Sequence, residues 1–286
     1  MHSGEIPSNW LLGSAMRAFH DPGRVDDEDF DGSGSCGHHP APEMSREMVS
    51  EIVRVPSSGL NLNVETFGEG STNVLFVHGL GANRDCWREA RQFFPASRFR
   101  LLFPDFPGVG DSDRPSDFDY SMAAFGRCLR DVVTSLGASA FHVVAHSMGG
   151  VAVLEACKLD GFVPVSFLSA EGNLEAEDAF MSSKMARLSE SVFLKTYSKW
   201  VNLVEATLDV AFNTQHARFV ASLRAASPVA VYRSAVSCQT LTRSRAPRRA
   251  IHRIAMSIGV RLWQPHASTA PPSSCARHRA RVSSRC

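Results

Sequence analysis

The sequence has no acidic residue after Asp209, and this absence divides the chain into two chemically different parts. Acidic residues crowd positions 26–31, whereas arginine crowds the last stretch, although the whole chain carries a formal net charge of only +1. Such an asymmetry is typical of charged tails rather than of a folded core. The near-neutral average gives no reason to expect nucleic acid or an anionic membrane as a partner.

Three further features are missing. No apolar run approaches the roughly 18 residues that a membrane helix needs, and the first residues lack the positive charge of a signal peptide. The 7 cysteines are scattered, odd in number and without a CxxC pair, which argues against a disulfide framework and a zinc site. We therefore expect a cytoplasmic protein without metal, organic cofactor or membrane contact, while the sequence leaves its oligomeric state open.

The composition along the chain predicts three regions. Residues 1–47 are rich in Asp, Gly, Ser, His and Pro without an apolar period, and we expect a disordered leader. Met44 and Met48 are alternative natural starts. Residues 48–240 show the pattern of a folded core, and residues 241–286 form a basic tail of low order.

Within the core, strand and helix patterns alternate. Residues 51–57 and 60–68 alternate apolar and polar around a Ser-Ser-Gly turn, which predicts an antiparallel hairpin. Short runs that are apolar on both faces predict buried parallel strands at 73–77, 100–103, 141–145 and 163–169. Helical patterns fall near 84–95, 121–137 and 149–160. This alternation predicts an α/β protein with a doubly wound, mostly parallel sheet.

Residues 174–235 have a helical pattern with little strand signal. Because this segment follows the central strands of the sheet, it is predicted either as a lid over a site or as ordinary packing helices. Its apolar side chains would suit an apolar acyl group in the first case and the core in the second.

The strongest local signal is the segment FHVVAHSMGG, in which a buried strand runs directly into Ser147 and then into a helix of small residues. A serine on such a sharp turn has strained backbone angles that expose its hydroxyl. The turn requires small residues two positions away on either side, and Ala145 and Gly149 meet this requirement. The pattern predicts Ser147 as a nucleophile.

A serine nucleophile needs backbone donors for negative charge and a base for its proton. The N–H of Met148 opens the helix after Ser147, and the N–H of Leu80 lies in the glycine-rich loop HGLG, so we predict these two as the oxyanion hole. His78 is expected to hold its own loop. His146 is expected to point elsewhere on the turn, which makes both histidines poor candidates for the base.

The motifs HGLG at 78–81, DFPGVGDSD at 105–113 and AHSMGG at 145–150 together resemble the α/β-hydrolase family over roughly residues 50–180. The resemblance implies a serine hydrolase that cleaves an ester or related acyl bond of a small molecule through an acyl-serine intermediate. It implies a loop-shaping role for Asp105, Gly108 and Gly110. A serine at 147 points away from relatives that carry aspartate there, the haloalkane dehalogenases and epoxide hydrolases.

The resemblance also implies an acid and a histidine after the nucleophile, but their usual Gly-x-x-Asp and Gly-His contexts are missing. Some relatives take the acid from the end of the sixth strand, where this chain has Glu171. His266 follows an apolar run at 260–263 and is our candidate base. His216, His252 and His278 remain as alternatives.

Beyond about residue 236 the chain has no Asp, Glu, Lys or Phe and is rich in Arg, Ala, Ser and Pro. One hypothesis is a reading frame lost near residues 237–245, which would remove the last two strands and the catalytic histidine. The alternative is a genuine basic tail that binds an acidic polymer.

Three functions therefore stay open: an active acyl hydrolase, an impaired hydrolase-fold protein that acts only by binding, and a basic-tail binding protein. Within the first, thioesterase, carbon–carbon bond hydrolase, acyltransferase and cofactor-free haloperoxidase reactions fit the same fold.

Overall fold

The computed structural model describes residues 48–172 and 180–243, and the predicted leader and nearly all of the predicted basic tail lie outside these ranges. The strands of the described part are β1 (Val49–Arg54), β2 (Asn61–Phe67), β3 (Thr72–Val77), β4 (Phe99–Pro104), β5 (Phe141–His146) and β6 (Ser166–Ala170). The helices are the 3₁₀ helix η1 (Arg84–Phe93), α2 (Met122–Ser135), α3 (Met148–Ala156), α4 (Phe180–Met185), α5 (Glu190–Thr207), α6 (Thr214–Ala225) and α7 (Pro228–Arg243).

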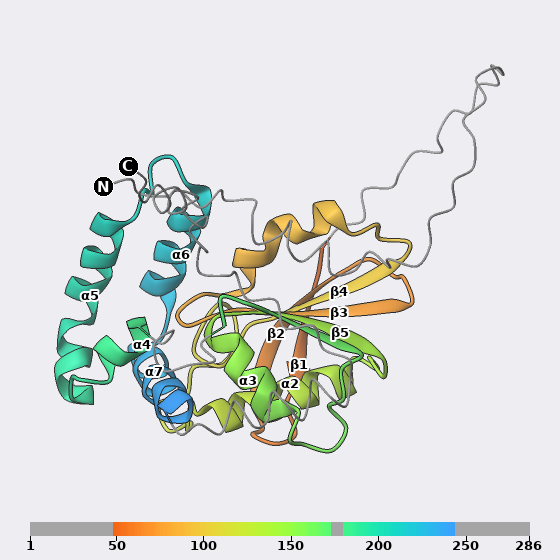
Figure 1. Cartoon of the computed structure of the whole chain (residues 1–286), viewed down its shortest axis with the longest axis horizontal. Helices are drawn as coiled ribbons and strands as arrows, with labels where there is room; N and C mark the ends of the chain where they lie inside the picture. The colour runs from red at the N-terminus through yellow and green to blue at the C-terminus, as the bar shows by residue number, and fades with distance from the viewer. Residues whose placement is uncertain (1–47, 173–179, 244–286) are drawn as a thin grey trace, which may run out of the picture.

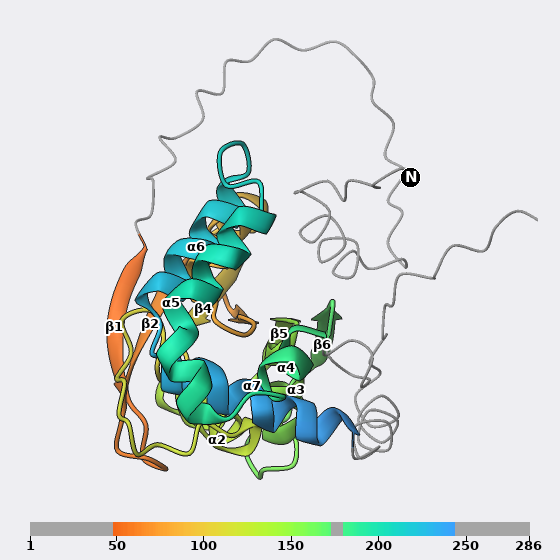
Figure 2. The ribbon, with the colours of Figure 1, turned by 90° about the vertical axis from the view of Figure 1, so that its left-hand side faces the viewer.

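The six described strands form one sheet in the order β1-β2-β4-β3-β5-β6. β1 and β2 make the predicted antiparallel hairpin, and β2 also runs antiparallel to β4. The remaining neighbours, β4, β3, β5 and β6, are parallel. Figure 2 shows β1 and β6 at opposite edges of this sheet. The predicted doubly wound, mostly parallel sheet is confirmed.

Helices cover both faces of the sheet, and the side chains of β3 show why. Val74 and Phe76 point to the face that carries η1, where they pack with Trp87. Leu75 and Val77 alternate with them and point to the face covered by α2 and α3. Figure 1 shows η1 above the sheet and α2 and α3 below it. A strand buried on both faces must be apolar throughout, which explains the continuous apolar run at 73–77.

The helices α4 to α7 form a group beside the sheet (Figure 1). Two hydrogen bonds fix this group to the loops that follow β3 and β4. Ser222 Oγ donates to the carbonyl oxygen of Gly81 at 2.9 Å, and the N–H of Ser227 donates to the carbonyl oxygen of Gly108 at 2.8 Å. The segment therefore covers the carboxyl ends of these strands as a lid does. Its apolar residues, Phe193 and Leu223 among them, also belong to the main core, so it packs as well.

The edge strand β6 pairs with β5 and with no other strand in residues 48–172 and 180–243. Just before it, Val163 and Val165 are 66% and 53% exposed. None of the helices in the same ranges is long and apolar enough to cross a membrane.

Candidate active site

Ser147 joins β5 to α3 with backbone angles of φ 52° and ψ −124°. A positive φ is costly for a residue with a side chain, and its neighbours hold it in place. The N–H of Ser147 donates to the carbonyl oxygen of Ala170 at 2.9 Å, which ties the turn to the end of β6. A Cβ on Gly149 would come within 2.6 Å of the carbonyl oxygen of His78, so this position requires glycine. The predicted sharp turn is present.

The loop after β3 passes directly over this turn. A Cβ on Gly79 would lie 3.1 Å from Cβ of Ser147, so the backbone of the loop is in van der Waals contact with the nucleophile. The amides of Leu80 and Met148 make no hydrogen bond to another residue within the described part of the chain. These amides, one in the loop and one at the start of α3, can each donate a hydrogen bond to a developing oxyanion.

His78 holds this loop in the way the sequence suggested. Its Nδ1 lies 2.9 Å from the carbonyl oxygen of Gly79, and the N–H of Phe106 donates to Nε2 at 3.0 Å. The second bond requires a lone pair on Nε2 and places the proton on Nδ1. Burial lowers the pKa of His78 to about 4, which keeps the ring neutral. With both nitrogens occupied, His78 is not available as a base for Ser147.

The middle motif shapes a neighbouring loop, as the resemblance implies. The buried carboxylate of Asp105 accepts hydrogen bonds from the N–H of Arg84 at 2.8 Å and of Asp111 at 2.9 Å, and pairs with the guanidinium of Arg84. Gly110 has a φ of 54°, and a Cβ there would collide with this carboxylate. Gly108 accepts the hydrogen bond that anchors α7. Asp105 therefore acts as a structural centre of the loop.

Glu171 directly follows β6, where the sequence predicted the acid, and has a φ of 48°. Its Oε2 lies 3.4 Å from Nε2 of His146, and this hydrogen bond lowers the pKa of the Glu171 carboxyl. The structure thus pairs the predicted acid with the histidine that precedes the nucleophile, which the sequence had led us to expect elsewhere on the turn. His266, His252 and His278 lie outside the described residues. His216 is in the first turn of α6, on a helix as expected.

A narrow apolar cavity of about 10 Å³ adjoins Met148, one of the two proposed oxyanion donors, and the glycines on either side of Leu80, the other. One side is formed by the loops around Gly79 and Phe106 and by Met148, and α7 closes the other. Its lining residues are His78, Gly79, Gly81, Phe106, Pro107, Val109, Phe125, Met148, Ala230, Val231 and Ser234. Met148 and the glycine-rich loop were predicted from sequence, but the α7 residues Ala230, Val231 and Ser234 could not be recognised, because they lie about 80 residues from the nucleophile along the chain.

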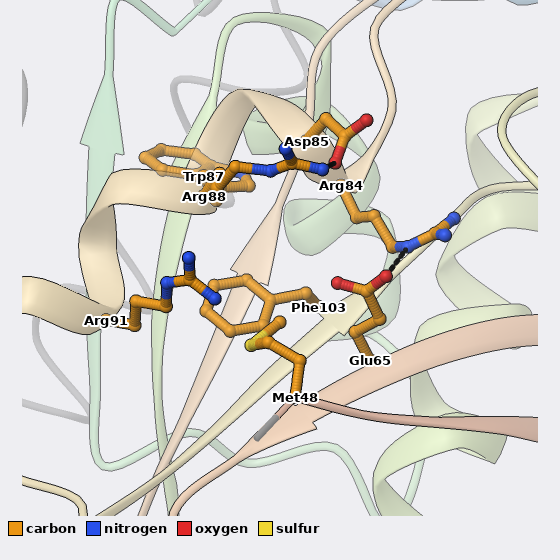
Figure 3. A pocket seen from close by; sticks show the side chains of 8 residues that line it. All are labelled: Met48, Glu65, Arg84, Asp85, Trp87, Arg88, Arg91 and Phe103. Carbon is orange, nitrogen blue, oxygen red and sulfur yellow. Dashed lines mark hydrogen bonds and ion pairs between the residues drawn. The ribbon is translucent and has the colours of Figure 1, made fainter. Parts of the chain in front are cut away.

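A larger cavity of about 280 Å³ lies between η1, β2 and β4 (Figure 3). Its arginines are partly neutralised: Arg84 Nε lies 2.8 Å from Glu65, and Arg88 pairs with Asp85. It is lined by neither Ser147 nor the two oxyanion amides. Size alone would favour this cavity, but the chemistry of a nucleophile places the candidate active site at Ser147.

Comparisons with known proteins agree with this geometry. The family model described as alpha/beta hydrolase fold matches residues 72–164, which include the predicted oxyanion loop and the Ser147 turn. An esterase from Exiguobacterium antarcticum superposes with a TM-score of 0.57 and 16% identity, over 75% of this chain and 90% of that one. The chain has the α/β-hydrolase fold.

Curated relatives match this chain over shorter stretches. An uncharacterized protein of Mycobacterium tuberculosis is 38% identical over 77 residues, which are 27% of this chain and 22% of the relative. The 2-hydroxymuconate semialdehyde hydrolase of Pseudomonas putida is 33% identical over 111 residues, 38% of each chain. The chain therefore spans less than half the length of these relatives.

Proposed function

We propose that this chain is a serine hydrolase that cleaves an ester or related acyl bond of a small molecule through an acyl-Ser147 intermediate. The observation that carries the proposal is the backbone of Ser147, whose φ of 52° at the junction of β5 and α3 makes the sharp turn of a nucleophile, in contact with the loop that contains Leu80. A hydroxyl next to converging donors can attack a carbonyl and stabilise the resulting oxyanion. The esterase-like fold of the structural neighbour is consistent with this reaction.

The acyl group that fits is a short one. The cavity beside the oxyanion amides is walled by Phe106, Val109, Phe125 and Val231, and a volume of about 10 Å³ holds roughly one water molecule. Its far wall, α7, is fixed by the Ser227–Gly108 hydrogen bond and by Ser237 Oγ, which accepts from the N–H of Met122 at 3.0 Å. Because this wall is anchored on both sides of the cavity, an acetyl ester suits it better than a longer acyl chain.

A second candidate function is that of an impaired hydrolase-fold protein, which retains the pocket and binds a ligand but does not hydrolyse it. One observation favours it: within residues 48–172 and 180–243, no histidine hydrogen-bonds to the hydroxyl of Ser147. A triad without its histidine still keeps about 10³-fold of catalysis over water through the oxyanion hole, far below a working enzyme.

A fluorophosphonate probe separates the two readings, because it labels only serines that are activated. The active reading predicts rapid labelling of the wild-type chain that is lost in Ser147→Ala. A folded wild-type chain that stays unlabelled would support the impaired protein instead. Thermal unfolding followed by circular dichroism confirms that both chains are folded during the comparison.

A further inference from the structure

We propose that the cavity between η1, β2 and β4 is a second binding site, which takes a small monocarboxylate that carries one apolar ring. The cavity measures about 280 Å³. This is the small end of the range for ligand pockets, which run from about 300 to 1,000 Å³. Such a volume suits a ligand of one ring rather than a peptide or a lipid chain. The inference goes beyond the proposed function, because no part of it depends on hydrolysis at Ser147.

The apolar side of the cavity is formed by Phe103, Trp87 and Met48 (Figure 3). Both rings are fixed by the core. Phe103 is 2% exposed and stacks on Phe76 with the ring centroids 5.0 Å apart, and Trp87 packs on the same Phe76 at 5.3 Å. A flat apolar ring that enters the cavity therefore meets aromatic side chains that are already ordered, which favours its binding.

Two of the three arginines that line the cavity already have carboxylate partners. Arg84 Nε lies 2.8 Å from Glu65, and the same guanidinium pairs with the buried Asp105. Arg88 pairs with Asp85 at 2.8 Å, one turn away on η1, and Figure 3 shows its guanidinium turned toward that carboxylate. These two arginines therefore hold the walls of the cavity together and have little charge left for a ligand.

The third arginine, Arg91, is different. Within residues 48–172 and 180–243 its guanidinium makes no ion pair or hydrogen bond. It lies in the last turn of η1, and Figure 3 shows it pointing toward Phe103 and Met48. A guanidinium presents two parallel N–H donors that match the two oxygens of a carboxylate. We therefore place the carboxylate of the ligand at Arg91 and its ring against Phe103.

The charges around the cavity favour one negative charge on the ligand over two. A single carboxylate neutralises Arg91, the unpaired cation of the lining. A dianion, such as a phosphate monoester, would bring a second negative charge near Glu65 and Asp85 without a cation to compensate it. A neutral ring would use the apolar side of the cavity but would leave Arg91 unpaired.

The cavity beside Met148 cannot take the same ligand. Its volume of about 10 Å³ is too small for a ring, and none of its lining residues carries a positive charge, since burial keeps His78 neutral. A ring-bearing carboxylate is therefore directed to the larger cavity. Binding there can be measured independently of any acyl intermediate at Ser147.

The test is a titration of the full chain with benzoate, followed by ligand-observed NMR. We expect a Kd of about 1 mM, which is typical of a ligand with so few atoms. Arg91→Ala should raise the Kd about tenfold, because the charge-assisted hydrogen bonds are lost. Arg91→Lys should give an intermediate Kd, since it keeps the charge without the fork. Arg98→Ala is the matched control and should stay within about twofold, because Arg98 is also exposed but lies over the ring of Phe99, outside the cavity.

Three further ligands test the chemistry of the site. Benzamide has the same ring and shape without the charge, acetate has the charge without the ring, and phthalate adds a second carboxylate. Each should bind about tenfold more weakly than benzoate if the ring, the charge and the single negative charge all matter. Benzamide that binds as tightly as benzoate would overturn the role of Arg91.

The inference is also overturned if the wild-type chain does not bind benzoate at ten times the expected Kd, or if Arg91→Ala binds it as well as the wild type does. Because Arg91 is exposed, Arg91→Ala should fold normally, and its thermal unfolding curve checks this. Ser147→Ala should bind benzoate like the wild-type chain. A chain that binds benzoate but does not react with fluorophosphonate would contradict the proposed function and leave this inference standing.

Discussion

The hydroxyl of Ser222 on α6 donates a hydrogen bond of 2.9 Å to the carbonyl oxygen of Gly81, next to the proposed oxyanion donor Leu80. Ser222 is buried, and on the same helix Leu223 packs where a Cβ of Gly81 would stand. The helical cover and the oxyanion loop are therefore mechanically linked. A substitution on α6 should therefore alter the oxyanion loop and the activity, although none of the proposed catalytic groups lies on α6.

Ser222→Ala tests this link. It leaves the buried carbonyl of Gly81 without its donor, so we expect a loss of about 1–2 kcal/mol in the free energy of unfolding. A loosened donor should also lower kcat/KM for 4-nitrophenyl acetate by about fivefold. Thr240→Ala is the control, since its hydroxyl bonds only to its own helix, at Val236. Equal effects of both changes on kcat/KM would contradict the link.

Gly149→Ala should disrupt the nucleophile turn. The new methyl would lie 2.6 Å from the carbonyl oxygen of His78 and 2.9 Å from that of Val77, and neither is at the end of a flexible side chain. We expect a loss of about 3 kcal/mol in unfolding free energy, measured in urea, with activity reduced at least tenfold.

The comparison for this change is Gly137→Ala. Gly137 has a φ of 65° but no heavy atom near its missing Cβ, so only backbone strain of about 1–2 kcal/mol should follow. Activity per folded molecule should be unchanged. A smaller loss in Gly149→Ala than in Gly137→Ala would show that the loop and the turn are not in contact.

His78 should make stability depend on pH. Its ordinary pKa of 6.5 falls to about 4 in the fold because burial penalises the charged ring. Protonation therefore favours the unfolded chain, so the stability due to this group is complete above pH 6.5 and is lost as the pH falls toward 4, by about 3 kcal/mol. Urea unfolding between pH 7 and 4 measures this slope. In His78→Gln the free energy of unfolding should depend less on pH over the same range. Equal pH dependence in the wild-type and variant chains would contradict the assignment.

Val231→Ala should widen acyl selectivity. Val231 on α7 lines the cavity beside the oxyanion amides, and removing two methyl groups makes room for a longer chain. We expect the ratio of kcat/KM for 4-nitrophenyl butyrate over acetate to rise about tenfold, since two methylenes are worth about 1.6 kcal/mol.

Val201→Ala on α5 is the matched control, because Val201 is equally buried in the helical segment but does not line the cavity. It should lower stability without changing the ratio. A ratio that rises in both variants would mean that selectivity reflects general loosening rather than the wall at Val231.

Much of the fold was predictable because its signals are local. The apolar runs at 73–77, 100–103 and 141–145 correspond to β3, β4 and β5 within one residue at each end. The run at 163–169 was less exact: β6 starts only at Ser166, because Val163 and Val165 are exposed before it. Apolar residues alone could not reveal that these two valines precede the paired strand.

The site was predictable only in part. Ser147 and Glu171 stand where the order of motifs placed them, since each follows a strand. The contact between Glu171 and His146 was not predicted, because it joins the ends of two different strands, β6 and β5, and has no local signal in the sequence. The walls of the cavity depend on α7, whose approach to the loop at Gly108 is a long-range contact without a local signal.

The most direct test of the account is the mass of the intact chain after brief mixing with 4-nitrophenyl acetate at acid pH. An acyl-serine mechanism predicts a single acetyl adduct, located by peptide analysis on Ser147 and missing in Ser147→Ala, together with a burst of 4-nitrophenolate. Steady hydrolysis with no adduct on Ser147, or an adduct that persists in Ser147→Ala, would contradict the central claim that Ser147 is the nucleophile.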